Sequence, residues 1–153
     1  MQVIAVTGPR RLTPEQYEQA TRELNALVVC PNWHVGDATG LDALALKVAC
    51  SSKVNFKMYQ KKVNLPYRAQ GAERSTRMVK ALAAMGGTLH AWPNKPAPPG
   101  LKPSRSWPKG AQGSGTWGTI ALAVGLGLPV ELHPLSDVVR SPEWLETQQL
   151  SLI

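Results

Sequence analysis

Residues 33–45 read Trp-His-Val-Gly-Asp-Ala-Thr-Gly-Leu-Asp-Ala-Leu-Ala. The first three residues have the character of a short strand, and the glycine-bearing segment 36–40 ends that strand. Apolar residues then recur at helical spacing from Leu41 onward. This stretch predicts a strand, a loop and a helix in immediate succession, and that order decides the fold class.

The same order recurs on both sides of this stretch. A β-branched run over residues 3–7 stops at Gly8, and Thr13 begins a helix whose first position is Pro14. Because strands that alternate with helices pair in parallel through right-handed crossovers, we expect an α/β fold, a Rossmann-like three-layer sandwich with a mostly parallel sheet of about five strands. The further predicted elements are strands at 54–59, 88–92 and 129–132, helices at 72–85 and from Gly113 to the stop at Gly127, and a weakly helical tail at 136–153.

Length and composition indicate one globular domain over residues 1–153. The chain carries 17 Lys and Arg against 10 Asp and Glu, and the net charge of +7 favours anionic partners such as nucleotides, nucleic acid or acidic surfaces. No apolar run approaches the roughly 18 residues of a membrane span, and residues 1–6 lack the features of a secretory signal. We therefore expect a cytoplasmic protein without a membrane partner, in which Cys30 and Cys50 are reduced core thiols.

Residues 93–113 interrupt the pattern of strands and helices. The segment is rich in proline and lysine, shows no periodicity and lies directly before the most glycine-rich part of the chain. Loops of this length are uncommon in compact domains and are usually functional or disordered. Two alternatives stay open, a lid over a ligand and a disordered segment.

Three glycine-bearing loops follow predicted strands, at residues 8–10, 36–40 and 113–116. The carboxyl ends of parallel strands meet at one edge of the sheet, where helix N-termini present unpaired N–H groups and the positive end of the helix dipole. Glycine lets the backbone approach phosphate oxygens closely, and nearby hydroxyl groups add donors. The loops carry neither the dinucleotide fingerprint nor the lysine of a P-loop, and we expect no bound cofactor. Phosphate is the expected ligand group.

Charged side chains flank these loops. Arg10 and Arg74 lie where a guanidinium group can bind a phosphate with two hydrogen bonds, and a solvated surface position is the equal alternative for each. Arg77 is expected on the surface. Asp42 is a candidate partner of the helix dipole, and Asp37 is either an acceptor for ribose hydroxyl groups or a helix cap. The candidate ligand contacts are Gly8, Pro9, Arg10, Gly36, Asp37, Gly40, Asp42, Arg74, Gly113, Ser114, Gly115, Thr116 and Thr119.

The three histidines, His34, His90 and His133, are predicted within or at the end of strands. They show no metal-ligand spacing with the two cysteines, so we expect structural histidines and no metal site. The sequence also shows no nucleophile elbow and no set of serine, histidine and aspartate that would mark a hydrolase.

Four motifs, taken in order, resemble those of the SLOG superfamily. They are Val-Ile-Ala-Val-Thr-Gly-Pro-Arg at 3–10, the motif at 34–45 quoted above, Arg-Ser-Thr-Arg-Met at 74–78 and Gly-Ser-Gly-Thr at 113–116. This superfamily includes the Lonely Guy phosphoribohydrolases, the DNA-processing protein A core and small bacterial and phage proteins of the YspA/YpsA-related branch, which looks most similar.

The resemblance implies a Rossmann-like fold whose glycine loops bind nucleotides or nucleotide-derived molecules. It also implies a homo-oligomer that pairs through helices beside the site. The binding residues that it carries over are Gly8, Arg10, Gly36, Gly40, Asp42, Arg74, Gly113, Gly115 and Thr116.

One departure from the superfamily bears on activity. Lonely Guy enzymes place a glutamate shortly after the glycine-threonine pair, whereas residues 117–123 contain no acid. If a glycosidic bond is cleaved, the catalytic candidates are Asp37, Glu73 and Arg74.

Three functional hypotheses follow. The leading one is a binding or sensor module for a nucleotide derivative, and the first alternative is a nucleoside-monophosphate phosphoribohydrolase-like N-glycosidase. The second alternative is single-stranded DNA binding, because basic and aromatic side chains together can form a stacking groove. The residues that support it are Arg10, Arg11, Lys61, Lys62 and Trp107.

Overall fold

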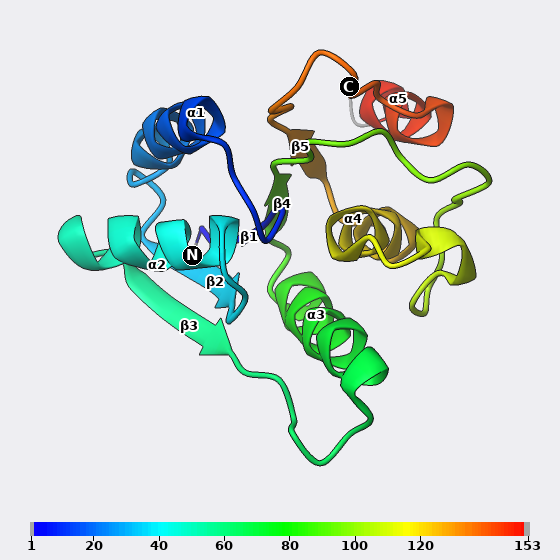
Figure 1. Cartoon of the computed structure of the whole chain (residues 1–153), viewed down its shortest axis with the longest axis horizontal. Helices are drawn as coiled ribbons and strands as arrows, with labels where there is room; N and C mark the ends of the chain where they lie inside the picture. The colour runs from blue at the N-terminus through cyan, green and yellow to red at the C-terminus, as the bar shows by residue number, and fades with distance from the viewer. Residues whose placement is uncertain (1, 152–153) are drawn as a thin grey trace.

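A five-stranded sheet forms the middle layer of the protein (Figure 1). The structure is a computed structural model that describes residues 2–151. The strands lie in the order β3-β2-β1-β4-β5, and every neighbouring pair is parallel. The predicted Rossmann-like α/β fold is therefore confirmed. The strands are β1 (Ile4–Thr7), β2 (Asn32–Gly36), β3 (Asn55–Tyr59), β4 (Thr88–Ala91) and β5 (Val130–Leu132).

Helices cover both faces of this sheet. α1 (Pro14–Ala26) and α2 (Leu41–Ser51) pack together on one face, and α3 (Tyr67–Ala84) and α4 (Gly115–Gly125) pack together on the other (Figure 1). A short 3-10 helix, η1 (Lys109–Ala111), precedes α4, and α5 (Glu143–Ser151) follows the last strand. Among residues 2–151, no helix has the length and apolar composition needed to cross a bilayer.

The alternation of side chains at the start of the chain divides the core into two halves. Val3 and Ala5 pack with residues of α3 and α4, whereas Ile4 and Val6 pack with residues of α1 and α2. Successive residues of a strand point to opposite faces, so a central parallel strand needs apolar residues at every position. This explains why residues 3–6 are uniformly apolar and buried.

One helix begins earlier than predicted. α3 begins at Tyr67 rather than at Ala72. Gly71 therefore lies inside the helix, although glycine disfavours a helix interior. Pro66 suits the position before the first turn, and the packing of α3 against α4 and the sheet tolerates the glycine.

One of the two cysteines lies outside the core. Cys30 is buried as expected, but Cys50 is exposed, so the prediction of a core thiol is wrong there. Ala49 is fully buried on the inner side of α2. Because each helical residue turns by about 100° from the one before, the next side chain points toward solvent.

The proline-rich segment 93–113 packs along α4. The Trp117 indole N–H donates to Lys95 O (2.9 Å). Trp107 lies against Gly118 in the middle of the helix. These contacts favour an ordered segment over the disordered alternative, and a lid that closes over a ligand stays a prediction.

Candidate functional site

The loop after β1 and the start of α2 fit closely together. The Leu41 N–H donates to Pro9 O (3.0 Å), and the Leu41 side chain packs against Gly8. Gly40 has a φ of +73°, and a Cβ there would lie 2.5 Å from Arg10 O, so only glycine allows this approach. The first two predicted loops therefore form one unit at the carboxyl edge of the sheet, where β1 and β2 are neighbours.

Arg74, from α3, lies between two carboxylates. Its Nη1 is 2.7 Å from Asp37 Oδ1 and 3.6 Å from Asp42 Oδ2. Gly36 leaves room for this arrangement, because a Cβ there would lie 2.5 Å from Arg74 Nη1 and 2.6 Å from Asp42 Oδ2. The structure thus brings these four predicted residues into contact, and the guanidinium group links α3 to the loop after β2.

The two aspartates have distinct environments. Burial raises the pKa of Asp42 from 3.8 to about 6, although Arg74 and the Ala38 N–H, which donates to Asp42 Oδ2 (3.1 Å), oppose this rise. Asp37 uses both carboxylate oxygens, because Oδ1 binds Arg74 and Oδ2 accepts the Lys61 N–H (2.9 Å). Asp37 therefore joins the loop after β2 to the chain after β3. It does not cap α2, which was one of the two predicted roles.

Glu73 and Arg77 form an ion pair on the outer side of α3. Arg77 Nη2 lies 2.9 Å from Glu73 Oε1, and Lys62 Nζ lies 3.8 Å from Glu73 Oε2. The hydrogen bonds from Arg77 hold the pKa of Glu73 below its ordinary value, so this carboxylate is ionised at neutral pH. Glu73 is therefore poorly suited to donate a proton as a catalytic acid.

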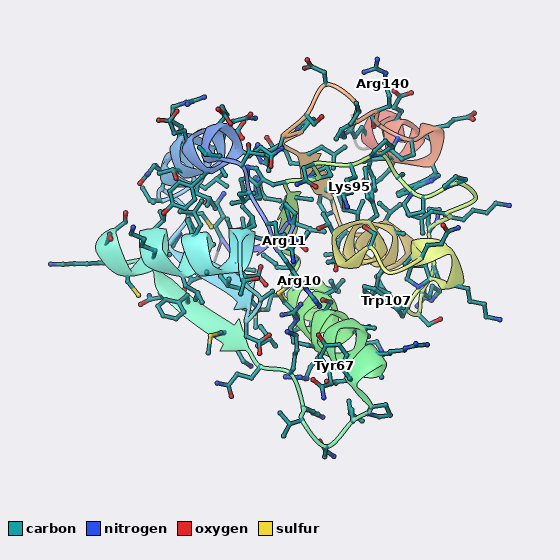
Figure 2. The ribbon with its side chains drawn as sticks, viewed as in Figure 1. Arg10, Arg11, Tyr67, Lys95, Trp107 and Arg140 are labelled. Atoms are coloured by element: carbon teal, nitrogen blue, oxygen red, sulfur yellow. The ribbon has the colours of Figure 1, made fainter. Side chains whose placement is uncertain are left out.

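Arg10 is exposed and has no ion-pair partner among the residues that the structure describes. Its backbone is held in place, because the Thr39 hydroxyl donates to Arg10 O (3.1 Å). The side chain reaches toward α3, where Nη2 lies 3.7 Å from the position that a Cβ of Gly71 would occupy. Figure 2 shows Arg10 and Arg11 near the middle of this view, between α2 and α3, with Trp107 farther along. A free guanidinium group thus lies beside the first two loops.

The third predicted loop begins α4. Ser114 is the N-cap, and its Oγ accepts the Trp117 N–H (3.2 Å). Thr116 is buried, and Thr119 is fully buried with its hydroxyl donating to Gly115 O (2.7 Å). The single hydroxyl hydrogen of Thr119 is therefore used inside the helix, and none is left to donate to a ligand. The prediction of Thr119 as a ligand contact is corrected accordingly.

The chain that follows β4 joins the third loop to the first. The Asn94 side chain donates to Arg11 O (3.4 Å), and the next residue, Lys95, accepts the indole N–H of Trp117 through its carbonyl oxygen (2.9 Å). Gly113, with a φ of +80°, turns the chain into α4. All three loops therefore lie at the carboxyl edge of the parallel sheet, as the sequence predicts.

An open groove of about 510 Å³ runs between α3 and Trp107. The sequence did not predict this groove. Spacing by three or four positions places the α3 residues on one helix face, but only the tertiary structure brings the indole opposite them. The groove is lined by Ala69, Ala72, Glu73, Thr76, Arg77, Lys80 and Trp107.

The fold is similar to that of a solved bacterial protein. The X-ray structure of DNA processing protein A from Streptococcus pneumoniae matches this chain with a TM-score of 0.57 and 13% sequence identity. The match covers 99% of this chain and 56% of the other, so the chain spans little more than half the length of that protein. No family model and no curated protein matches the sequence. At this identity the likeness concerns the fold, and the chain has a Rossmann-like fold of the kind found in DNA processing protein A.

Proposed function

We propose that this chain binds the phosphate groups of a nucleotide or nucleotide-derived molecule, as a binding or sensor module. Arg10 carries the proposal. It is exposed and has no ion-pair partner within residues 2–151. The loop that carries it is hydrogen-bonded to the N-terminus of α2 and to the loop before that helix. Helix N-termini and unpaired guanidinium groups both favour phosphate oxygens. The net charge of +7 favours the same class of ligand.

The carboxylates of the site favour binding over bond cleavage. Asp37 is engaged by Arg74 and by the Lys61 N–H, and Glu73 is ionised and paired with Arg77. An N-glycosidase needs a group that protonates the leaving base or activates water. These two candidates are held as structural ion pairs, which makes the hydrolase the weaker hypothesis.

Calorimetric titration of the full chain with nucleoside mono-, di- and triphosphates, ADP-ribose, NAD and cyclic nucleotides tests the proposal. For the ligand that binds, Arg10→Ala should weaken the affinity about tenfold or more, because a charge-assisted hydrogen bond contributes roughly 1.5–3 kcal/mol. Arg140→Ala is the matched control, since this exposed arginine lies beside α5, away from Arg10 (Figure 2). Binding by none of these compounds, or equal loss in both variants, would contradict a phosphate site at Arg10.

Single-stranded DNA is a second candidate ligand, which the groove beside α3 favours. Trp107 offers an aromatic face, and Arg77 and Lys80 line the same groove. Bases stack on aromatic side chains while cations follow the phosphate backbone. The fold is also similar to that of a protein whose name denotes DNA processing.

Fluorescence anisotropy with a labelled oligothymidylate separates this candidate from the first. A DNA-binding chain should lose affinity steeply as salt rises, and Trp107→Ala should weaken binding, because stacking contributes roughly 1–3 kcal/mol per base. A chain that binds mononucleotides but shows no oligothymidylate binding at low salt rules out the DNA hypothesis.

A further inference from the structure

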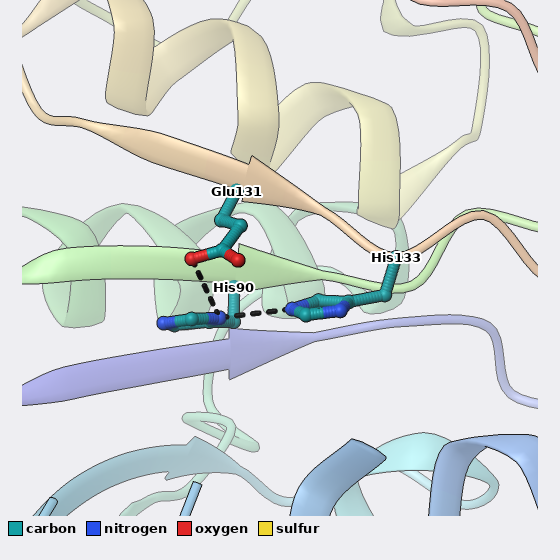
Figure 3. Close-up of side chains that lie close together, drawn as sticks. All are labelled: His90, Glu131 and His133. Carbon is teal, nitrogen blue, oxygen red and sulfur yellow. Dashed lines mark hydrogen bonds and ion pairs between the residues drawn. The ribbon is translucent and has the colours of Figure 1, made fainter. Parts of the chain in front are cut away.

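Two histidines and a glutamate meet on the face of the sheet that α1 covers. The parallel register places His90 of β4 beside Glu131 of β5, and His133 follows two residues later on the same side. His90 Nδ1 lies 2.9 Å from His133 Nε2 and 3.8 Å from Glu131 Oε2, as Figure 3 shows. One ligand atom from each residue lies within 4.8 Å of the others.

A second carboxylate, Glu23 of α1, lies beside this cluster. Glu23 Oε2 lies 3.9 Å from His133 Nδ1, while Glu23 Oε1 accepts the Trp92 indole N–H (3.1 Å) and a hydrogen bond from Gln19 (3.3 Å). The Trp92 ring also stacks on His133, with centroids 4.4 Å apart. A histidine that ligates through one nitrogen commonly presents the other to a carboxylate, which fixes its tautomer. Glu23 lies on the Nδ1 side of His133, although 3.9 Å is too long for a hydrogen bond, and His133 Nε2 is directed into the cluster.

We propose that His90 Nδ1, His133 Nε2 and the Glu131 carboxylate bind a divalent first-row metal ion, of which Zn²⁺ is the best match. A set of two histidines and one glutamate is a known zinc donor set, and it leaves a fourth position for water. This site is separate from the proposed phosphate site and does not depend on it. It departs from the sequence-based expectation of structural histidines and no metal.

The geometry requires only small shifts to hold the ion. Tetrahedral zinc with nitrogen ligands at about 2.0–2.1 Å needs the two nitrogens about 3.3 Å apart, against 2.9 Å between His90 and His133 here. The Glu131 side chain is 63% exposed, so it can rotate to close its 3.8 Å separation from His90. Its exposure also leaves the fourth position open to solvent.

The charge balance of the cluster suits a divalent cation. A neutral imidazole ligates through the nitrogen that carries no proton, so the ion replaces the proton of the hydrogen bond between His90 Nδ1 and His133 Nε2, and the ring that donated this bond carries its proton on its other nitrogen. Glu131 and Glu23 then supply two negative charges around the site. Glu131 and Glu23 are the charged side chains that face the two rings.

Calorimetric titration of the full chain with Zn²⁺, in a Cys50→Ser background that removes the exposed thiol, tests the site. We expect one ion per chain, and a loss of affinity of at least about tenfold in Glu131→Gln. Glu18→Gln is the matched control, because it removes an exposed carboxylate of α1 and should leave binding unchanged. The ¹⁵N resonances of His90 Nδ1 and His133 Nε2 should shift when the ion binds.

Three results would each overturn the proposal. The first is the absence of stoichiometric Zn²⁺ binding by the parent chain. The second is binding that Glu131→Gln leaves unchanged, and the third is binding that leaves the two histidine resonances in place. Because Glu131 is exposed, its substitution should not prevent folding, so a loss of binding can be assigned to the missing ligand.

Discussion

Arg74 is charged, its side chain is only 10% exposed, and it pairs with Asp37 and Asp42. A buried charge is tolerated only when it is paired, and removal of one partner leaves the other uncompensated. Substitution of Arg74 would therefore disturb folding and any ligand contact together. Exposed Arg10 is the better residue for a binding test, because its loss leaves no buried charge behind.

Asp42 makes the stability of the protein depend on pH. Its pKa is raised from 3.8 to about 6, mainly by burial, so the folded state holds the proton more tightly than the unfolded state does. The stabilisation is complete below pH 3.8 and disappears as pH rises through about 6. A difference of about two units corresponds to about 3 kcal/mol.

We predict that this dependence disappears in Asp42→Asn. The difference in the free energy of unfolding between the parent chain and the variant should be larger at pH 4 than at pH 7.5 by about 2 kcal/mol, because pH 4 lies just above the unfolded pKa of 3.8 and the stabilisation is not yet complete there. Urea titrations of both proteins at the two pH values measure it, and the other titrating groups cancel in the difference. A constant difference, or one that grows with pH, would show that Asp42 ionises without a burial penalty.

At the scale of elements, α4 and the segment 93–113 behave as one packed unit. Trp107 lies so close to Gly118 that no Cβ fits there, and the backbone of Ser104 approaches Gly125 in the same way. The glycines of α4 would weaken an isolated helix, but here they allow the loop to lie flat on it. Trp107 also forms one wall of the groove beside α3.

Gly118→Ala should destabilise the protein by about 1–3 kcal/mol, because the added methyl group overlaps the Trp107 ring. Thermal or urea unfolding measures the loss. The cost should shrink in a Trp107→Ala background, where the overlap is absent. Gly115→Ala is the control, since a Cβ there has no neighbour within 4 Å, and a similar loss in both single variants would point to backbone effects instead of the indole contact.

At the scale of the whole molecule, α5 completes the half of the core that α3 and α4 form. Leu145 is fully buried in this half, and the Trp144 indole N–H donates to Leu101 O (3.0 Å) in the proline-rich segment. The segment 93–113 therefore packs between α5 on one side and α4 on the other. The predicted homo-oligomer stays a prediction, which light scattering can measure.

Leu145→Ala should lower the free energy of unfolding by about 2–5 kcal/mol, the usual cost of removing a fully buried leucine side chain. Amide hydrogen exchange should increase first in α5 and in residues 97–104, and remain slow in α1 and α2, which border the other half of the core. Val138→Ala is the control, because Val138 is 56% exposed. A uniform increase across both halves would mean that the molecule opens as a single unit.

Much of the architecture follows from local patterns. The apolar run at 3–6, the capping box of Thr13 and Gln16, and the glycine loops each predict an element or a turn that the structure contains. Boundaries were less accurate where a local signal was weaker than packing, as at Gly71 inside α3. Position within a helix also decided that Cys50 is exposed and that Thr119 is buried.

The sequence by itself determined the class of fold and the edge of the sheet at which the loops meet, because period, capping and turn chemistry act between residues close in the chain. Only the tertiary structure decided which distant side chains touch. Arg74 between Asp37 and Asp42, Trp107 over α3, and His90 beside Glu131 and His133 each join separate elements. Such contacts depend on strand order, register and helix packing, which no spacing along a single chain encodes.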